Sequence, residues 1–314
     1  MRITSRAAVG AATAAVALLG AACGSSGSSG ASGSGSTATI ASKLVFGAPP
    51  DCATNKLCAI GLKNVYGVVF KQIKTTDFGG PITVQALKSG AVQVGELFST
   101  AVYDPSFVTL ADDKHLESSD NIVPVIRQAV DTPQIDKILN DISAQLSTSG
   151  MLDLNKMVDV SQQDPAAVAK SFLSQKSLGT TTSGCTGHLT VGVSGNFSES
   201  KIVAEMYGQA LQTAGCTVAY QLDLSSRKVS DAALFGGQID LKPEYLASES
   251  SALSSSAGVS GDAQNNATIL KGLLKAKNVN VLDFAPAIDT NVFVVTKATA
   301  AKYGLTSVSD LAKT

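Results

Sequence analysis

The residues that could carry enzymatic chemistry are few, and their spacing is poor. Only two histidines occur, His115 and His188, and neither lies at zinc-site spacing. The run Gly192-Val193-Ser194-Gly195-Asn196 falls one glycine short of a nucleophile elbow, and neither histidine has an evident serine partner. The glycines of 30–35 belong to a Gly/Ser tract without the strand and helix that a phosphate loop needs. These patterns argue against an enzyme, a bound metal or another cofactor.

The remaining reactive side chains are five cysteines, namely Cys23, Cys52, Cys58, Cys185 and Cys216. Setting Cys23 aside leaves an even number, as is typical of an oxidising, exported setting. Cys52 and Cys58 lie six residues apart in a loop, and Cys185 and Cys216 each directly precede an apolar strand. If those strands are parallel neighbours, their starts lie side by side. We therefore expect the disulfides Cys52–Cys58 and Cys185–Cys216.

The N-terminus has the features of an export signal. Arg2 and Arg6 precede an apolar stretch of 13 residues, Ala7 to Leu19, which is shorter than the roughly 20 residues of a spanning helix. The segment Leu18-Leu19-Gly20-Ala21-Ala22-Cys23 resembles a bacterial lipobox. We expect a signal peptide over 1–22, a lipidated Cys23 on the extracytoplasmic face of the cell membrane, and a Gly/Ser tether over 23–42. The alternative is an ordinary secretory leader with an incidental cysteine.

Size and composition are those of a globular protein. The chain has 314 residues, enough for two domains, with 44% hydrophobic and 16% charged residues. The formal net charge is −1, and it becomes −3 without the two leader arginines. A near-neutral chain without a basic stripe argues against nucleic acid as a partner.

Strand and helix patterns alternate along the chain. We expect strands such as 43–47, 68–73, 92–98, 107–110 and 122–126, and helices at 81–88, 133–146 and 199–214. This alternation predicts an α/β fold with mostly parallel sheets. Residues 176–187 break the pattern as a polar linker. A helix–glycine–strand pattern at 86–94 is repeated at 233–241. The repeat is either a common feature of α/β proteins or a sign of two similar lobes.

Three segments carry a resemblance to a known family. They are 189–245 ("LTVGVSGNFSES", "GGQIDLKPEY"), 284–314 ("AAKYGLTSVSDLAKT") and 43–175 ("QALKSGAVQVGELFST", "VTLADDKH"). These segments resemble the osmoprotectant substrate-binding proteins of bacterial ABC importers, which bind glycine betaine, carnitine or choline. The family's second half stands first in this chain. The order indicates a circular permutant, or alternatively a tandem duplication that lost its outer quarters.

The resemblance implies a two-lobed type II periplasmic-binding-protein fold, circularly permuted. Lobe B would comprise 43–104 plus 289–314, and lobe A would comprise 105–288, including the permutation linker 176–187. The chain would cross between the lobes near 99–106 and 287–293. A ligand would bind between the lobes, and its partners would be the permease and ATPase subunits of the importer.

The resemblance also implies where a ligand would bind. Such proteins surround a quaternary ammonium with tyrosine faces. Tyr245 retains one of these tyrosines and Phe98 replaces another, while Asp120 and Asn291 stand where the remaining two would be. Asp289 keeps the polar residue of the crossover.

The charges expected in this cleft favour a cation. Gly195 and Asn55 stand where the family has basic residues that would hold a ligand carboxylate. Asp120 and Asp289 would then face a ligand without a matched Arg or Lys, unless Lys242 points inward, or unless Asp120 lies in a loop outside the cleft. We expect a small organic cation such as choline, bound by a transport lipoprotein. The alternative is a ligand-sensing or structural lipoprotein without a transport role.

Overall fold

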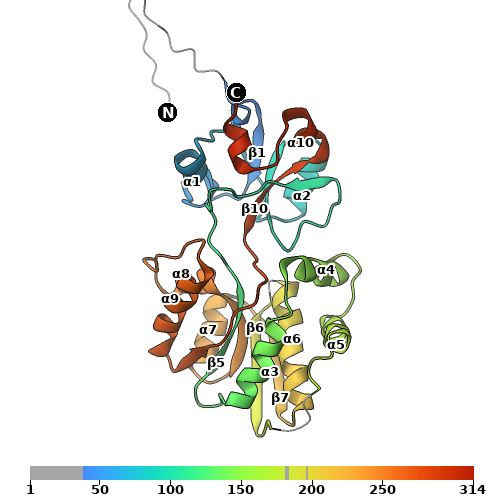
Figure 1. Cartoon of the computed structure of the whole chain (residues 1–314), viewed down its shortest axis with the longest axis vertical. Coiled ribbons are helices and arrows are strands. Elements are labelled where there is room, and N and C mark those ends of the chain that lie inside the picture. Colours follow the sequence, from blue (N-terminus) through green and yellow to red (C-terminus); the bar gives the residue numbers. More distant parts are fainter. Residues whose placement is uncertain (1–37, 181–183, 196) are drawn as a thin grey trace, which may run out of the picture. The chain divides into compact units, whose positions relative to one another are not determined.

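The computed structural model describes residues 38–180, 184–195 and 197–314 (Figure 1). The predicted signal peptide, Cys23 and most of the predicted tether lie outside the described residues. Residues from Ala38 to Thr314 form one compact unit. Within the described ranges, no helix has the length and apolar character needed to cross a membrane.

The first sheet has five strands among the described residues, in the order β2-β1-β3-β10-β4. Strand β1 runs parallel to both β2 and β3, whereas β10 pairs antiparallel with β3 and β4. The bounds are β1 Val45–Ala48, β2 Gln72–Thr75, β3 Val94–Phe98, β4 Phe107–Thr109 and β10 Asn291–Thr296. Strand β10 therefore reaches this sheet from far along the chain.

The second sheet repeats this design in the described part of the chain, in the order β7-β6-β8-β5-β9. Strand β6 is parallel to β7 and β8, and β5 is antiparallel to β8 and β9. The bounds are β5 Ile122–Arg127, β6 His188–Ser194, β7 Thr217–Leu224, β8 Leu241–Tyr245 and β9 Val279–Val281. Each sheet thus contains one antiparallel strand that arrives from the other. This is the two-lobed α/β organisation of the type II binding-protein fold.

Helices cover the sheets (Figure 1). Those beside the first sheet are α1 Ala59–Gly61, α2 Pro81–Lys88 and α10 Lys297–Tyr303, with the short turns η1 Ala41–Lys43, η2 Cys52–Thr54, η3 Leu62–Tyr66 and η4 Val308–Ala312. The others are α3 Pro133–Ser143, α4 Thr148–Asp159, α5 Pro165–Gln175, α6 Ser198–Thr213, α7 Arg227–Phe235, α8 Leu246–Leu253 and α9 Ala263–Lys275. Helices α4 and α8 were not expected from the sequence, and the strand expected at 68–73 begins only at Gln72.

Helix α3 shows how the sequence sets these elements. The Thr132 side chain accepts a hydrogen bond from the amide of Ile135, and Pro133 occupies the first helical position. Ile135, Ile138, Leu139 and Ile142 recur at helical spacing and are all buried in the larger core of the second sheet. The apolar stripe therefore fixes which face of α3 packs on the sheet.

One boundary between the two lobes differs from the expected one. Strand β4 lies in the first sheet, beside β10, whereas residues from 105 onward were expected in the lobe of the second sheet. After β3 the chain returns to the same sheet through 99–106 and crosses only after Thr109. A three-residue strand carries no periodicity that says which sheet it joins.

The two ends of the described chain are adjacent. The amide of Ile40 donates to the carbonyl oxygen of Lys313 at 2.7 Å. At the other predicted junction, the described residues of 176–187 are mostly exposed, although Cys185 is buried.

Both predicted disulfides are present. Cys52–Cys58 has a Cα–Cα distance of 5.1 Å, and Cys185–Cys216 has one of 5.0 Å. Cys185 precedes β6 and Cys216 precedes β7, and these strands are parallel neighbours as expected. The second bridge therefore links the starts of two adjacent strands.

Candidate functional site

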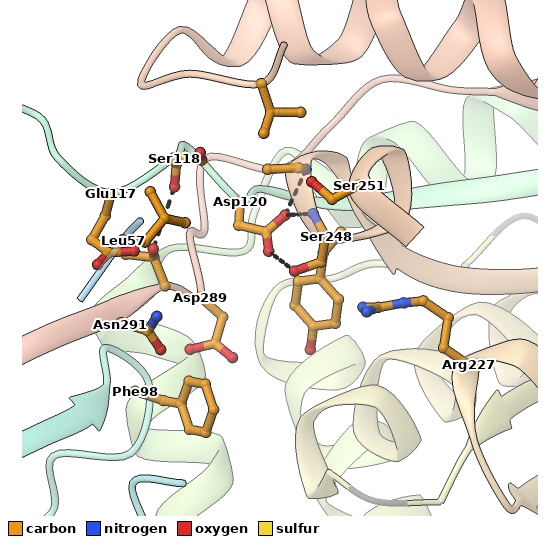
Figure 2. A pocket seen from close by; sticks show the side chains of 14 residues that line it. Leu57, Phe98, Glu117, Ser118, Asp120, Arg227, Ser248, Ser251, Asp289 and Asn291 are labelled. Atoms are coloured by element: carbon orange, nitrogen blue, oxygen red, sulfur yellow. Dashed lines mark hydrogen bonds between the residues drawn. The ribbon is translucent and has the colours of Figure 1, made fainter. Parts of the chain in front are cut away.

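A cavity of about 300 Å³ is bounded by residues from the ends of strands in both sheets and from the crossing segments (Figure 2). All five predicted ligand residues line it, namely Phe98, Asp120, Tyr245, Asp289 and Asn291. The motif positions therefore meet at one place in the fold. Contact of these residues with a ligand remains a prediction.

Tyr245 ends strand β8 and is held at its hydroxyl. The hydroxyl donates to Glu199 Oε1 at 2.7 Å, and Asn155 Nδ2 donates to the other carboxylate oxygen at 3.0 Å. Glu199 is only 3% exposed, and burial raises its pKa. This acid lies in the first turn of α6, and sequence reasoning missed it. It fixes the direction of the Tyr245 ring.

Asp289 lies in the segment before β10. Its Oδ1 accepts from Thr100 Oγ1 at 2.9 Å, and Ser99 Oγ lies 3.5 Å away. Burial raises the pKa of Asp289 to about 8, and the nearby charge of Glu199 adds to this effect. Without a ligand the raised pKa favours the protonated carboxyl, and an incoming cation would favour its ionised form.

Asp120 lines the cavity, but its oxygens are committed to the protein. Oδ1 accepts from the amides of Ala247 at 2.7 Å and Ser248 at 3.0 Å, and Oδ2 accepts from the Ser248 hydroxyl. Burial raises its pKa to about 6. Asp120 thus caps the start of α8, and it has little acceptor capacity left for a ligand.

The aromatic wall extends beyond the expected residues. Phe98 meets Phe197 edge to face, with ring centroids 5.7 Å apart. Both rings line a smaller cavity of about 50 Å³ that also borders Asp289, Glu199 and Tyr103. Phe197 directly precedes α6, and a large apolar side chain between the end of β6 and the start of that helix was the signal that could have identified it.

Asn291 and Glu117 form the far wall. Figure 2 shows Glu117, Asn291, Phe98 and Asp289 toward one side of the cavity. Burial, together with the nearby charge of Glu96, raises the pKa of Glu117 to about 9. The acids on this side are therefore less ionised than their count suggests.

Arg227 supplies the cation that the sequence did not predict here. It begins α7 and lines the cavity, and Figure 2 shows its guanidinium on the side away from Asp289. Its Nε donates to Glu244 Oε1 at 3.1 Å and lies 3.4 Å from Glu249 Oε2. Burial lowers the pKa of Arg227, but both acids raise it, so the guanidinium stays charged.

Lys242 does not enter the cavity. Its side chain is 1% exposed and forms ion pairs with Asp231, with Glu244 at 3.1 Å and with Glu249 at 3.7 Å. Lys242 and Tyr245 stand three residues apart on β8, and alternate strand residues face opposite sides. The clustered acids Asp231, Glu244 and Glu249 therefore surround the ammonium group of Lys242 rather than a metal ion.

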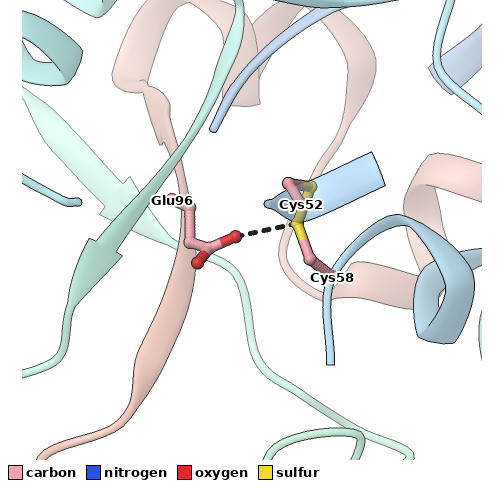
Figure 3. Close-up of side chains that lie close together, drawn as sticks. All are labelled: Cys52, Cys58 and Glu96. Carbon is pink, nitrogen blue, oxygen red and sulfur yellow. Dashed lines mark hydrogen bonds between the residues drawn. A yellow bond between two sulfur atoms is a disulfide. The ribbon is translucent and has the colours of Figure 1, made fainter. Parts of the chain in front are cut away.

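The Cys52–Cys58 loop forms another part of the wall. Leu57, next to Cys58, lines the cavity, and the bridge lies against Glu96 (Figure 3). Glu96 Oε2 is 3.0 Å from Cys58 Sγ, and burial raises the pKa of this acid to about 7. Because the two sulfurs are bonded to each other, they do not act as thiolate metal ligands. The bridge restrains the loop that carries Leu57.

Solved structures with low sequence identity resemble the chain. YckB of Bacillus subtilis shares 11% identity over 86% of this chain and 81% of that chain, with a TM-score of 0.42. The L-cystine solute receptor of Neisseria gonorrhoeae shares 11% over 86% and 87%, with a TM-score of 0.43. An ancestral arginine-binding protein shares 11% identity over 87% of this chain and 90% of that chain, with a TM-score of 0.36.

A family model matches nearly all of the described residues. The model is that of the substrate binding domain of ABC-type glycine betaine transport systems, and it matches residues 35–175 and 187–314. The chain therefore belongs to this family of substrate-binding domains of ABC transporters, whose members bind a solute and are not enzymes.

Proposed function

We propose that the chain is the extracytoplasmic solute-binding lipoprotein of an ABC importer, and that it binds a small quaternary amine or related organic cation in the cavity of Figure 2. One observation carries the ligand class. The Asp289 carboxyl lines the same cavity as the rings of Phe98 and Tyr245, and no protein cation forms an ion pair with it among the described residues.

The chemistry of a cation fits this arrangement. An aromatic face attracts a cation by about 0.5–2 kcal/mol, with the larger values in dry sites. A buried carboxyl without a paired cation is costly to ionise, and a ligand cation removes that cost. Tyr245 is suited to this role because its hydroxyl is tied to Glu199, which leaves the ring face free for contact.

The anchor and the chain order belong to the same proposal. Lipidation of Cys23 would keep the protein at the outer face of the membrane, close to a permease. We propose that the order of segments in this chain is a circular permutation of the family's order. Lobe B would comprise 43–104 and 289–314 together with β4, and lobe A would comprise the rest of 105–288. The hydrogen bond between Ile40 and Lys313 supports this, as does the break in the family match at 176–186.

A thermal-shift screen tests the ligand class. The purified protein is heated with choline, glycine betaine, carnitine, polyamines or neutral amino acids. A ligand at 100 times its Kd stabilises the folded state by about 2.7 kcal/mol, so at least one quaternary amine should raise the Tm clearly. The control is Tyr245→Ala, which should lose the shift. A rise in Tm with amino acids alone would contradict the proposed ligand class.

A further inference from the structure

An exposed apolar groove lies at the outer edge of the first sheet. Its volume is about 330 Å³, and its walls come from α1, η3 and the residues that lead into β2. It shares no lining residue with the cavity of Figure 2. Three large apolar side chains at this groove are solvent-exposed, Ile60 by 38%, Val69 by 55% and Ile73 by 37%. Exposed apolar side chains that gather in one place mark a contact surface.

Lysines surround the groove. Residues 41–75 contain five lysines and a single acid, Asp51, which gives this segment a formal charge of +4 in a chain whose net charge is −1. Among the described residues, none of the five forms an ion pair. Their charges are therefore free to attract an anionic partner. We call the groove and these exposed lysines the basic face; the lysines are Lys43, Lys56, Lys63, Lys71 and Lys74.

The sheet edge at this face is protected against a further strand. Strand β2 is the outer strand of its sheet and pairs only with β1 among the described strands. Lys71 directly precedes β2 and Lys74 lies within it, on either side of Ile73. Lysines on an edge strand oppose the addition of another strand, so a protein strand fits this edge poorly. Several lysines beside a few exposed aliphatic side chains are instead typical of a surface that lies on an anionic bilayer.

The start of the described chain lies beside the basic face. The Lys71 amide donates to the carbonyl oxygens of Ala41 at 3.2 Å and Leu44 at 3.0 Å. The proposed lipid anchor, Cys23, precedes the first described residue, Ala38, by 15 residues. A fully extended chain of that length spans about 50 Å at most. An anchored protein would therefore hold the basic face near the bilayer at a high effective concentration.

From this combination of charge, exposed apolar side chains and position we infer that the basic face binds the anionic lipid headgroups of the membrane surface. Lys63 lines the groove, and its neighbours Ile60 and Val69 would enter the headgroup layer. This contact goes beyond the proposed function, because it is a second attachment to the membrane, made by the folded body and independent of the ligand and of the acyl chain.

Vesicle sedimentation tests the inference. The exported full chain carries Cys23→Ser, so that no acyl chain contributes to binding. It is mixed with vesicles of phosphatidylcholine alone, or of equal parts of phosphatidylcholine and phosphatidylglycerol. Binding to the mixed vesicles should be about tenfold tighter or more, and it should weaken as the salt concentration rises. Because each lysine near an anionic surface contributes about fivefold, Lys63→Gln combined with Lys71→Gln should weaken binding to the mixed vesicles by about tenfold or more.

A matched control separates this face from a general effect of charge. Lys137→Gln combined with Lys170→Gln removes the same charge from exposed positions on α3 and α5, beside the other sheet, and should leave vesicle binding unchanged. Val69→Ser keeps every charge and should weaken binding to the mixed vesicles, because it removes an apolar side chain from the headgroup layer.

Three results would overturn the inference. They are equal binding, or no binding, to both kinds of vesicle, and binding to the mixed vesicles that survives in the Lys63 and Lys71 double variant. A third is self-association of the chain that the double variant abolishes while neither vesicle binds, which would assign the face to a second copy. Each of these results leaves the proposed ligand class and the lipidation of Cys23 untouched, since the assay uses neither.

Discussion

Removal of the Lys242 ammonium should destabilise the protein strongly without emptying the binding cavity. The side chain is 1% exposed and forms ion pairs with Asp231, Glu244 and Glu249. Replacement by Met keeps the length of the side chain and deletes the charge. Glu244 and Glu249 then keep Arg227 as their remaining cation among the described residues, whereas Asp231 loses its ion-pair partner.

The magnitude follows from the cost of an uncompensated buried charge. Deleting one partner of a buried ion pair costs about 3–5 kcal/mol. For a chain of this size, 1 kcal/mol corresponds to a Tm change of roughly 2–4 °C. We therefore expect Lys242→Met to lower the Tm by roughly 6–20 °C. The exposed Lys137 pairs with Asp141 on α3, and Lys137→Met should change the Tm by little, as exposed pairs do.

The assay is thermal and urea denaturation followed by far-UV circular dichroism, at one pH and ionic strength. A double variant provides the internal check. Glu249 is fully buried, and neither of its oxygens has a hydrogen-bond partner among the described residues. Adding Glu249→Leu to Lys242→Met removes an unpaired acid and should recover part of the lost stability. A Tm within about 2 °C of the native value for Lys242→Met, or no recovery in the double variant, would refute this account of the cluster.

Three further predictions concern pH, the disulfides and the anchor. Because the pKa of Glu117 rises to about 9 from its usual 4.5, the unfolded chain releases this proton at a lower pH than the folded chain does. Stability without ligand should therefore fall between about pH 4.5 and pH 9. The Tm should decline less with pH in Glu117→Gln than in the native protein, and an identical slope would contradict the assignment. Replacing both cysteines of a disulfide by Ala should cost about 3–4 kcal/mol of stability for Cys185–Cys216, which spans 31 residues, but only about 2 kcal/mol for Cys52–Cys58, which spans 6. Ligand affinity should fall more when Cys52–Cys58 is removed, because its loop carries Leu57. The reverse ranking of affinities in calorimetry would count against a role of this loop in binding. Cys23→Ser should move the exported protein from the detergent phase to the aqueous phase in Triton X-114 partitioning, and unchanged partitioning would rule out lipidation of this cysteine.

The sequence predicted elements well where their ends carry local signals. Pro81 and Pro133 each mark the first turn of a helix, and both helices begin there. Helix α4 was missed because Gly150 lies in its first turn and its buried apolar residues, Met151 and Leu154, are too few to show a stripe. The sheet that β4 joins depends on contacts with β10, nearly 190 residues later, which local periodicity does not encode.

The sequence predicted those site residues that correspond to motif positions of the family. Tyr245, Phe98 and Asp289 line one cavity because they end or flank strands that meet there. The capping role of Asp120 was not predictable, since it depends on α8, a helix that the sequence did not reveal.

The charged groups that the sequence analysis missed lie in the first turns of helices. Glu199 is the second residue of α6 and lines the smaller cavity, whereas Arg227 begins α7 and lines the larger one. Only the packing of these helices on the second sheet brings the two side chains to the site. That Lys242 points away from the cavity could have been inferred, because residues 242 and 245 face opposite sides of one strand.

The most direct test of the account is a calorimetric titration of the purified protein with small quaternary amines and betaines, repeated with Tyr245→Ala. The account predicts saturable binding of at least one of them with one site per chain, and a loss of affinity of about tenfold or more in Tyr245→Ala, because the variant deletes an aromatic face worth up to about 2 kcal/mol. Absence of saturable binding for every compound, or equal affinity in the native protein and Tyr245→Ala, would contradict it.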